Sequence, residues 1–202
     1  MNYIHTNEYL ECLNSLMFVS ELTRKLKTTP YYWKWVIISF HNAIQSLMVM
    51  SLQGTNGLLT LKKKSEEAWL KSYYEGSQNR SKLELDNFLN LYDKIKSTNH
   101  LSFEHSKQYC PPGNQDFSVK TLNSLRNDFI HFGSRFWSVE ISGLPKIILD
   151  CLDIAIFQCE FSGTIFFTDS RPREPLLNEL YNQNVFFGEL KVEYEKLAEQ
   201  AR

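Results

Sequence analysis

The stretch from Tyr31 to Leu52 constrains the fold more than any other part of the chain, because it is apolar nearly all round. A helix of this kind is either buried among other helices or embedded in a membrane. His41, Asn42 and Gln45 lie at its middle, and such polar groups would be costly at the centre of a bilayer. Acids interrupt the second apolar stretch, residues 147–167, in the same way. We therefore expect buried bundle helices and no membrane span.

Further segments also repeat apolar residues every three or four positions, the spacing of an amphipathic helix. Prolines at the first helical positions, Pro30 and Pro145, mark two helix starts. The expected helices cover about residues 7–27, 31–52, 65–74, 81–95, 118–134, 144–157 and 174–200. With almost no strand pattern, the sequence predicts an all-α fold, an up-and-down helical bundle with a four-helix core and additional helices.

Two serines give the expected starts of helices inside the chain. Ser81 with Glu84 matches a capping box, in which each side chain satisfies a free backbone N–H group of the other residue. Ser118 is the expected cap of the next helix. We also expect the strongly apolar helix at 144–157 to be the main packing partner of the helix at 31–52.

Length and charge define the general class of the protein. At 202 residues the chain predicts one helical domain, 1–202, with its core at about 7–165 and a C-terminal helix at about 174–200. The net charge of −1 gives no overall field, so any anion-binding site must be local. The four cysteines show no paired spacing, and the N-terminus has no signal-peptide pattern. We therefore expect a cytoplasmic protein without disulfides.

The segment from Leu122 to Phe132 combines an apolar stripe with a polar patch. The stripe is formed by Leu122, Leu125, Phe129 and Phe132. Asn127 and His131 are four residues apart and lie on one helix face, and Arg126 is about 100° away around the helix. A cation, an amide and an imidazole are therefore expected to converge on one patch.

The pattern Arg-Asn-x-x-x-His, here Arg126, Asn127 and His131, resembles the signature of the HEPN superfamily of small α-helical bundles. Residues 122–157 look most like a subgroup of uncharacterised bacterial HEPN-like proteins. The resemblance implies a metal-independent endoribonuclease that acts as a homodimer in toxin, phage-defence or RNA-processing settings. It implies no cofactor and no metal, an RNA substrate, and a possible antitoxin or regulatory protein as a partner.

These three residues also make chemical sense for RNA cleavage without a metal. The reaction needs a base for the 2′-hydroxyl proton, an acid for the leaving 5′-oxygen and a cation beside the phosphorane. Imidazole can serve in either proton role, and guanidinium matches phosphate oxygens with paired donors. A two-fold interface along this helix would supply a second His131, so we expect His131 as acid or base, Arg126 as the cation and Asn127 as an orienting or phosphate-binding group.

Two other interpretations of the patch stay open. Asn127 and His131 can form hydrogen bonds inside a helical core while Arg126 pairs with a surface acid. The chain would then be a catalytically silent HEPN-like module for binding or dimerisation, or an unrelated structural bundle. An active site requires Arg126 and His131 to be exposed in a shared groove, whereas the silent module does not.

A few residues outside the motif are candidates for a supporting role. His41 and Gln45, one turn apart, need polar partners either in a structural network or at the Arg126 patch; we favour the structural role. Trp137 follows the motif closely enough to reach its cleft, although tryptophans more often serve packing. The spacing of His100, His105 and Cys110 does not match a zinc site.

Overall fold

The computed structural model describes residues 2–76, 82–101, 104–131 and 137–200. Across these ranges the chain forms seven α-helices and no β-strand, which confirms the predicted all-α fold. The buried apolar side chains form one continuous hydrophobic core.

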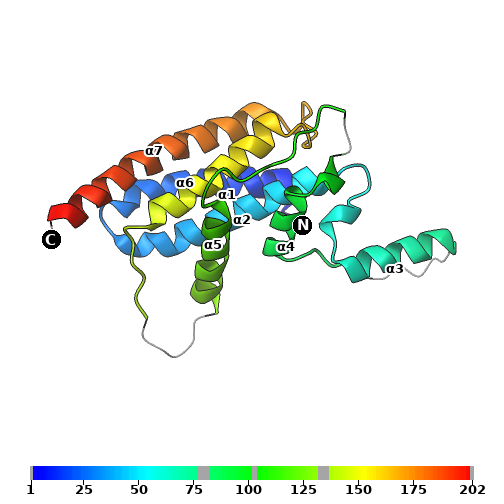
Figure 1. Cartoon of the computed structure of the whole chain (residues 1–202), viewed down its shortest axis with the longest axis horizontal. Coiled ribbons are helices and arrows are strands. Elements are labelled where there is room, and N and C mark those ends of the chain that lie inside the picture. Colours follow the sequence, from blue (N-terminus) through cyan, green and yellow to red (C-terminus); the bar gives the residue numbers. More distant parts are fainter. Residues whose placement is uncertain (1, 77–81, 102–103, 132–136, 201–202) are drawn as a thin grey trace.

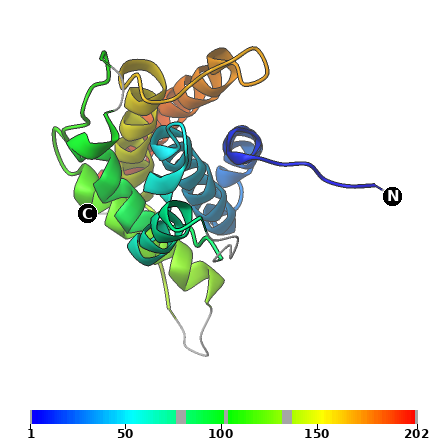
Figure 2. The same ribbon diagram turned by 90° about the vertical axis from the view of Figure 1, so that its right-hand side faces the viewer.

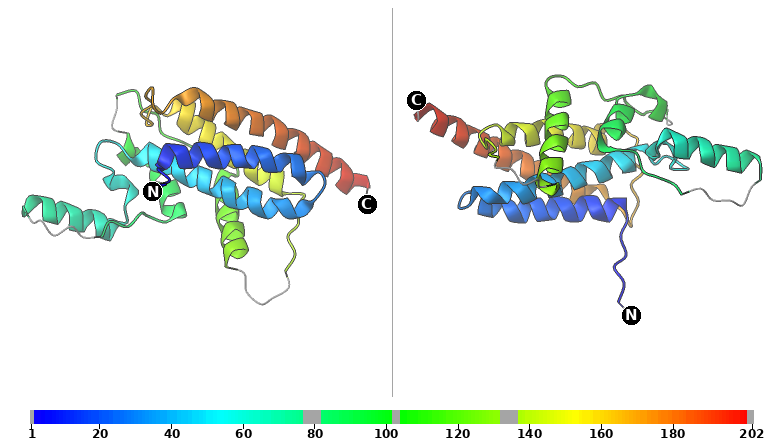
Figure 3. Two further views of the ribbon diagram at one scale, coloured as in Figure 1. Left: turned by 180° about the vertical axis from the view of Figure 1, so that it is seen from behind. Right: turned by 90° about the horizontal axis from the view of Figure 1, so that it is seen from below.

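Four helices form the core of the bundle: α1 (Glu8–Leu26), α2 (Trp33–Leu52), α6 (Leu144–Ile156) and α7 (Arg173–Gln200). The helices run in opposite directions within the pair α1–α2 and within the pair α6–α7, whereas α2 and α6 run in the same direction (Figures 1 and 3). α7 also packs against α1. Side chains from all four helices are fully buried at the centre, among them Leu16, Phe40, Ile148 and Phe187. The predicted helical bundle with a four-helix core is therefore confirmed; it consists of two antiparallel helix pairs, and α7 belongs to its core.

Local sequence explains where the first two helices begin. The Asn7 side chain accepts a hydrogen bond from the Leu10 backbone N–H at 2.9 Å, which satisfies a free donor at the start of α1. Pro30 opens a 3₁₀ turn, Pro30–Tyr32, that leads directly into α2. Proline suits this position because its fixed φ matches the helix and its missing N–H would have no intrahelical partner.

The expected pairing of the helices at 31–52 and 144–157 is wrong. α2 packs mainly against α1, and α6 packs mainly against α7 and α5. The short connection through Pro30–Tyr32 makes α1 and α2 a helical hairpin, so the first partner of α2 is its neighbour in the chain. Apolar content showed that α2 is buried, but it does not specify which helix covers it.

One end of the bundle contains a buried polar network. α6 continues into a π-helical segment, Phe157–Phe161, and Gln158 from this segment faces the end of α2. The Ser51 hydroxyl donates to Gln158 Oε1 at 2.7 Å and lies 2.6 Å from the Thr164 hydroxyl, which itself is 2.8 Å from that of Ser162. The three hydroxyl groups and Gln158 Oε1 satisfy one another inside the protein, whereas Gln158 Nε2 is buried without a hydrogen-bond partner among the described residues.

The α4 helix (Phe88–Ile95) begins later than the predicted capping box. Its cap is Asn87, whose side chain accepts from the Asn90 N–H at 3.0 Å. Glu84 instead pairs with Lys62, through both a backbone hydrogen bond and a 2.9 Å ion pair. The Lys62–Glu84 pairing joins the residues directly before α3 (Lys63–Tyr74) to those before α4. The α3 helix itself projects from the bundle (Figure 1). Ser81 lies outside the described residues.

The α5 helix (Gln115–Ile130) crosses the bundle, and its C-terminal half extends beyond the four core helices (Figures 1 and 2). It begins after Asn114, not at Ser118, whose hydroxyl donates to the buried Asp150 carboxylate at 2.6 Å. The helix also ends before the predicted boundary, because His131 leaves helical geometry with φ −96° and ψ 58°. Phe132 lies outside the described residues.

By length and composition, the segment Pro30–Leu52 could cross a membrane, and it is the one such segment in the ranges that the structure covers. In the bundle, 67% of its most apolar window is buried. A core helix of a soluble protein passes the same test, so the segment is weak evidence for a membrane span.

Candidate functional site

Arg126 and Asn127 interact directly on the projecting half of α5. Arg126 Nη1 donates a hydrogen bond to Asn127 Oδ1 at 3.0 Å. Both side chains are partly exposed. The amide therefore orients the guanidinium. The sequence suggested other partners for Asn127, namely His131 or a phosphate oxygen.

Arg126 lies at a pocket between α5, α1 and α2, which we call the polar pocket. The pocket has a volume of about 290 Å³ and is lined by Ser15, Ile38, Ser39, His41, Asn42, Gln45 and Arg126. Two of the predicted supporting residues, His41 and Gln45, thus lie in the same pocket as the predicted cation. Hydroxyl and amide groups form most of the remaining lining, which suits a polar or charged ligand.

His41 is the buried member of the polar pocket, with 3% of its surface exposed. Its ring stacks on Phe88 with 3.9 Å between the ring centroids, and its Nε2 lies 3.2 Å from Asn123 Oδ1. An amide oxygen can only accept a hydrogen bond, so Nε2 carries the proton. His41 therefore has the structural partners that the sequence required, and it also contacts the Arg126 pocket.

The surroundings of His41 keep its ring neutral at physiological pH. Burial lowers the pKa of His41 to about 4, since a buried imidazolium would lose its hydration; the Asn123 hydrogen bond opposes this effect, and the nearby Arg126 charge adds to it. In the neutral ring, Nδ1 has no proton because Nε2 holds it. The polar pocket thus combines a permanent cation with an uncharged imidazole.

His131 occupies a different place from Arg126. It follows the last residue of α5, its side chain is exposed, and its backbone N–H donates to the Asn127 carbonyl at 2.8 Å. Within the described part of the chain, its side chain has no hydrogen-bond or ionic partner, and it does not line the polar pocket. The structure thus brings Arg126 and Asn127 together and leaves His131 one turn further along, facing solvent.

Trp137 belongs to a second pocket, which we call the aromatic pocket. Its ring packs against Phe129 with 5.1 Å between the ring centroids. The pocket has a volume of about 390 Å³ and is lined by Pro30, Tyr31, Trp33, Lys34, Phe129, Trp137, Val139, Ile141 and Leu144. Trp137 therefore lies near the end of α5, as the sequence suggested, but outside the polar pocket.

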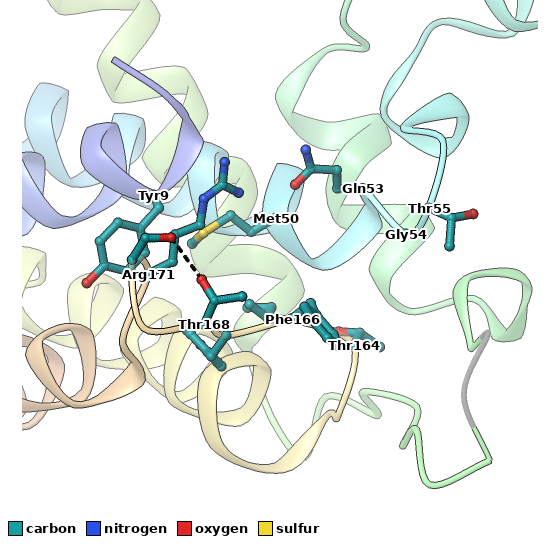
Figure 4. Close-up of a pocket in the computed structure, with 12 residues that line it drawn as sticks. Tyr9, Met50, Gln53, Gly54, Thr55, Thr164, Phe166, Thr168 and Arg171 are labelled. Atoms are coloured by element: carbon teal, nitrogen blue, oxygen red, sulfur yellow. Dashed lines mark hydrogen bonds between the residues drawn. The ribbon is translucent and has the colours of Figure 1, made fainter. Parts of the chain in front are cut away.

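A third pocket lies at the opposite end of α2 and contains none of the predicted site residues (Figure 4). This pocket, which we call the loop pocket, has a volume of about 540 Å³. It is formed by the start of α1, the end of α2 and the loop that follows the π-helical segment. Arg171 lines it and forms a 2.6 Å ion pair with Glu8. No sequence motif indicated this pocket, because its walls come from three segments that are distant from one another in the chain.

The histidines and cysteines form no metal cluster in the described ranges, and three of the four cysteines are buried, whereas Cys110 is exposed. The residues that the structure describes contain no group of three or more His, Cys, Asp or Glu side chains arranged to hold a metal ion. His100 Nδ1 instead lies 2.5 Å from the Ser97 carbonyl oxygen. Cys12, Cys151 and Cys159 are buried, and burial raises the pKa of Cys159 to about 12, which keeps it protonated and unreactive.

No protein-family model matches the chain, and no curated protein or solved structure is significantly similar to it. The function must therefore be inferred from the side chains at the pockets. Of the three pockets, the polar pocket combines an oriented guanidinium with neutral hydrogen-bonding groups. Such a combination is suited to a phosphate or phosphodiester group.

Proposed function

We propose that the protein is a metal-independent endoribonuclease of the HEPN type, a cytoplasmic homodimer that acts as a toxin or a phage-defence effector. One observation carries this proposal: Arg126, oriented by Asn127, lines an open polar pocket on the same projecting helix half that ends at the exposed His131. A cation and a titratable imidazole are thus both accessible to a strand that passes along α5.

In the proposed reaction, the guanidinium of Arg126 binds the non-bridging oxygens of the scissile phosphate and stabilises the charge of the phosphorane. One imidazole removes the proton of the 2′-hydroxyl, whose oxygen attacks phosphorus. A second imidazole protonates the 5′-oxygen as the P–O5′ bond breaks. The products are a 2′,3′-cyclic phosphate and a 5′-hydroxyl end.

One chain offers one His131 at this helix end, so the second imidazole is assigned to His131 of a second copy. The exposed end of α5 supports such an arrangement. Ile130, the last helical residue, is 44% exposed and offers an apolar contact next to His131. A two-fold contact through these ends would bring two histidines together.

A second candidate function is a catalytically silent HEPN-like module that binds an antitoxin or another regulatory protein. The observation that favours it is the position of His131 outside the pocket that contains Arg126. In this case Arg126 would bind an acidic or phosphate group of a partner without cleavage.

RNA cleavage in chelator-containing buffer tests the proposal. We expect the wild-type protein to cleave single-stranded RNA, and we expect Arg126→Ala and His131→Ala to reduce the rate by about 100-fold or more, the usual contribution of an acid, a base or an oxyanion-stabilising group. Arg24→Ala and His5→Ala remove exposed residues of the same types far from α5 in the sequence and serve as matched controls.

The ends of the fragments and the size of the protein complete the test. Cyclic phosphate ends and a dimer in solution agree with the proposed reaction. Undiminished cleavage by a folded His131→Ala protein rejects the catalytic assignment. A wild-type protein that binds RNA or a protein partner but never cleaves RNA would support the silent module instead.

A further inference from the structure

We propose that the aromatic pocket binds one unpaired nucleobase of a single-stranded RNA whose neighbouring phosphate lies in the polar pocket. This inference deepens the proposed function and rests on it for the choice of RNA as the ligand. It assigns Tyr31 and Trp137 as the residues that contact the base.

The pocket offers aromatic surface in a form suited to stacking. Tyr31 is 65% exposed, and Trp137 is partly exposed while its ring rests on Phe129. Trp33, in contrast, is buried, and its indole N–H donates to the Tyr194 hydroxyl at 3.2 Å, which fixes the pocket floor. Aromatic rings that remain accessible above a fixed floor form a platform on which any base can stack.

The two pockets follow each other along the same two helices. On α5, Phe129 of the aromatic pocket comes three residues after Arg126 of the polar pocket. On α2, Lys34 of the aromatic pocket comes four residues before Ile38 of the polar pocket. One helical turn advances by about 5.4 Å, so a base and an adjacent phosphate of one strand can occupy the two pockets together.

The charges around both pockets favour a polyanion over other occupants. Lys34 lines the aromatic pocket and Arg126 lines the polar pocket, and no acid is among the described lining residues of either pocket. An acid in contact with this lining is Glu11, which accepts a 3.3 Å hydrogen bond from Asn42 of the polar pocket. The ammonium of Lys34 lies 5.2 Å from the centroid of the Trp35 ring, so cationic and aromatic groups alternate here. A second copy of the chain bound over the aromatic pocket would cover Lys34 without an identified acidic partner for it. The phosphate backbone of RNA supplies a negative charge for Lys34.

Binding of a short, unstructured, fluorescently labelled RNA to the full-length His131→Ala protein tests the inference, since this variant should not degrade the probe. We expect Tyr31→Ala and Trp137→Ala each to weaken binding by about tenfold, because each substitution removes one surface on which the base stacks. Trp137→Phe should keep most of the affinity. Tyr73→Ala is the matched control, since Tyr73 is an equally exposed tyrosine (67%) on the projecting α3.

Abasic probes locate the base that is bound. Removal of one base at the bound position should weaken binding at least as much as Tyr31→Ala does, and Tyr31→Ala should cause no further loss with this abasic probe. Tyr31 is exposed, so its substitution should leave the fold intact even if Trp137→Ala does not fold.

The possible results separate this inference from the proposed function. RNA binding that depends on Tyr31, in a wild-type protein without nuclease activity, would reject catalysis and retain the base pocket. Cleavage with an unchanged KM in Tyr31→Ala would retain catalysis and overturn the base pocket. Absence of RNA binding would also overturn it, as would a shift from dimer to monomer in Tyr31→Ala, which would make the pocket a contact between copies.

Discussion

The two halves of α5 differ in almost every physical respect. In the N-terminal half, Val119 and Leu122 are fully buried, and Ser118 donates to the buried Asp150. In the C-terminal half, Arg126 and the residues around it are partly or fully exposed, and the helix extends beyond the bundle (Figure 2). One half thus fixes the helix in the protein, and the other half presents polar groups to solvent.

This division shows how a single helix can serve stability and ligand binding separately. Substitutions on the anchored half remove core contacts and change the free energy of unfolding. Substitutions of the polar residues on the projecting half remove few contacts, so their effects should be limited to binding or catalysis. Leu125 and Phe129 of this half still pack against the core. His41 of α2 shares features of both halves. It is buried in the bundle, and it also lines the polar pocket beside Arg126.

The largest expected effect on stability comes from Leu122→Ala in the anchored half. Leu122 is fully buried, so the substitution leaves a cavity and should lower the free energy of unfolding by about 2–5 kcal/mol. Ile130→Ala in the projecting half should change the free energy of unfolding by about 0.5 kcal/mol or less, as is usual for exposed positions. Urea unfolding measures both values, and equal losses would contradict the division of α5.

The next effect is a dependence of stability on pH that originates at His41. Because the pKa of His41 is lowered from 6.5 to about 4 in the folded protein, the unfolded chain takes up this proton first as the pH falls. The contribution is present above pH 6.5 and is lost as the pH falls towards 4, by about 3 kcal/mol at most.

Urea unfolding between pH 7 and pH 4 measures this effect. His41→Gln keeps a side-chain donor near Asn123 but cannot titrate, so its stability should fall less steeply with acid. Part of the slope should remain, since burial also lowers the pKa of His100. If both proteins lose stability in parallel, His41 does not have the neutral, buried state described above.

The smallest effect on stability is expected for Asn127→Ala, which should separate loss of function from loss of stability most clearly. Its hydrogen bond to Arg126 is partly exposed, so the free energy of unfolding should change by about 0.5 kcal/mol or less. The guanidinium loses its orientation, and RNA cleavage or binding should weaken by about tenfold. Ser124→Ala, an exposed neighbour on the same half, is the control. A large loss of stability would show that Asn127 belongs to the anchored part.

Much of the fold could be predicted because helix signals are local. Asn7 and Pro30 mark helix starts through interactions with residues only a few positions away. The errors arise where distant residues compete with local ones. Ser118 fits a helix cap, but it bonds to Asp150, 32 residues away; Glu84 fits a capping box, but it pairs with Lys62.

The candidate site could be predicted only in part for the same reason. The sequence indicated that His41 and Gln45 need polar partners, but it could not specify Asn123 or the pocket of Arg126, which the packing of α5 on α2 creates. Periodicity placed His131 one turn after Asn127, yet it did not show that the helix ends there. The end of a helix depends on the chain that follows it, and His131 is not a residue type that usually marks a helix C-terminus.

The buried network of Ser51, Gln158, Ser162 and Thr164 has a consequence for the alignment of the bundle. Apolar contacts are non-directional, so two helices held by them alone are aligned less strictly than helices that also share hydrogen bonds. A shift of the π-helical segment relative to α2 would separate these hydroxyl and amide groups and leave them unsolvated in an apolar interior. The network thus favours a single register of the π-helical segment against α2. This register sets the distance between the loop pocket and the two pockets at α5.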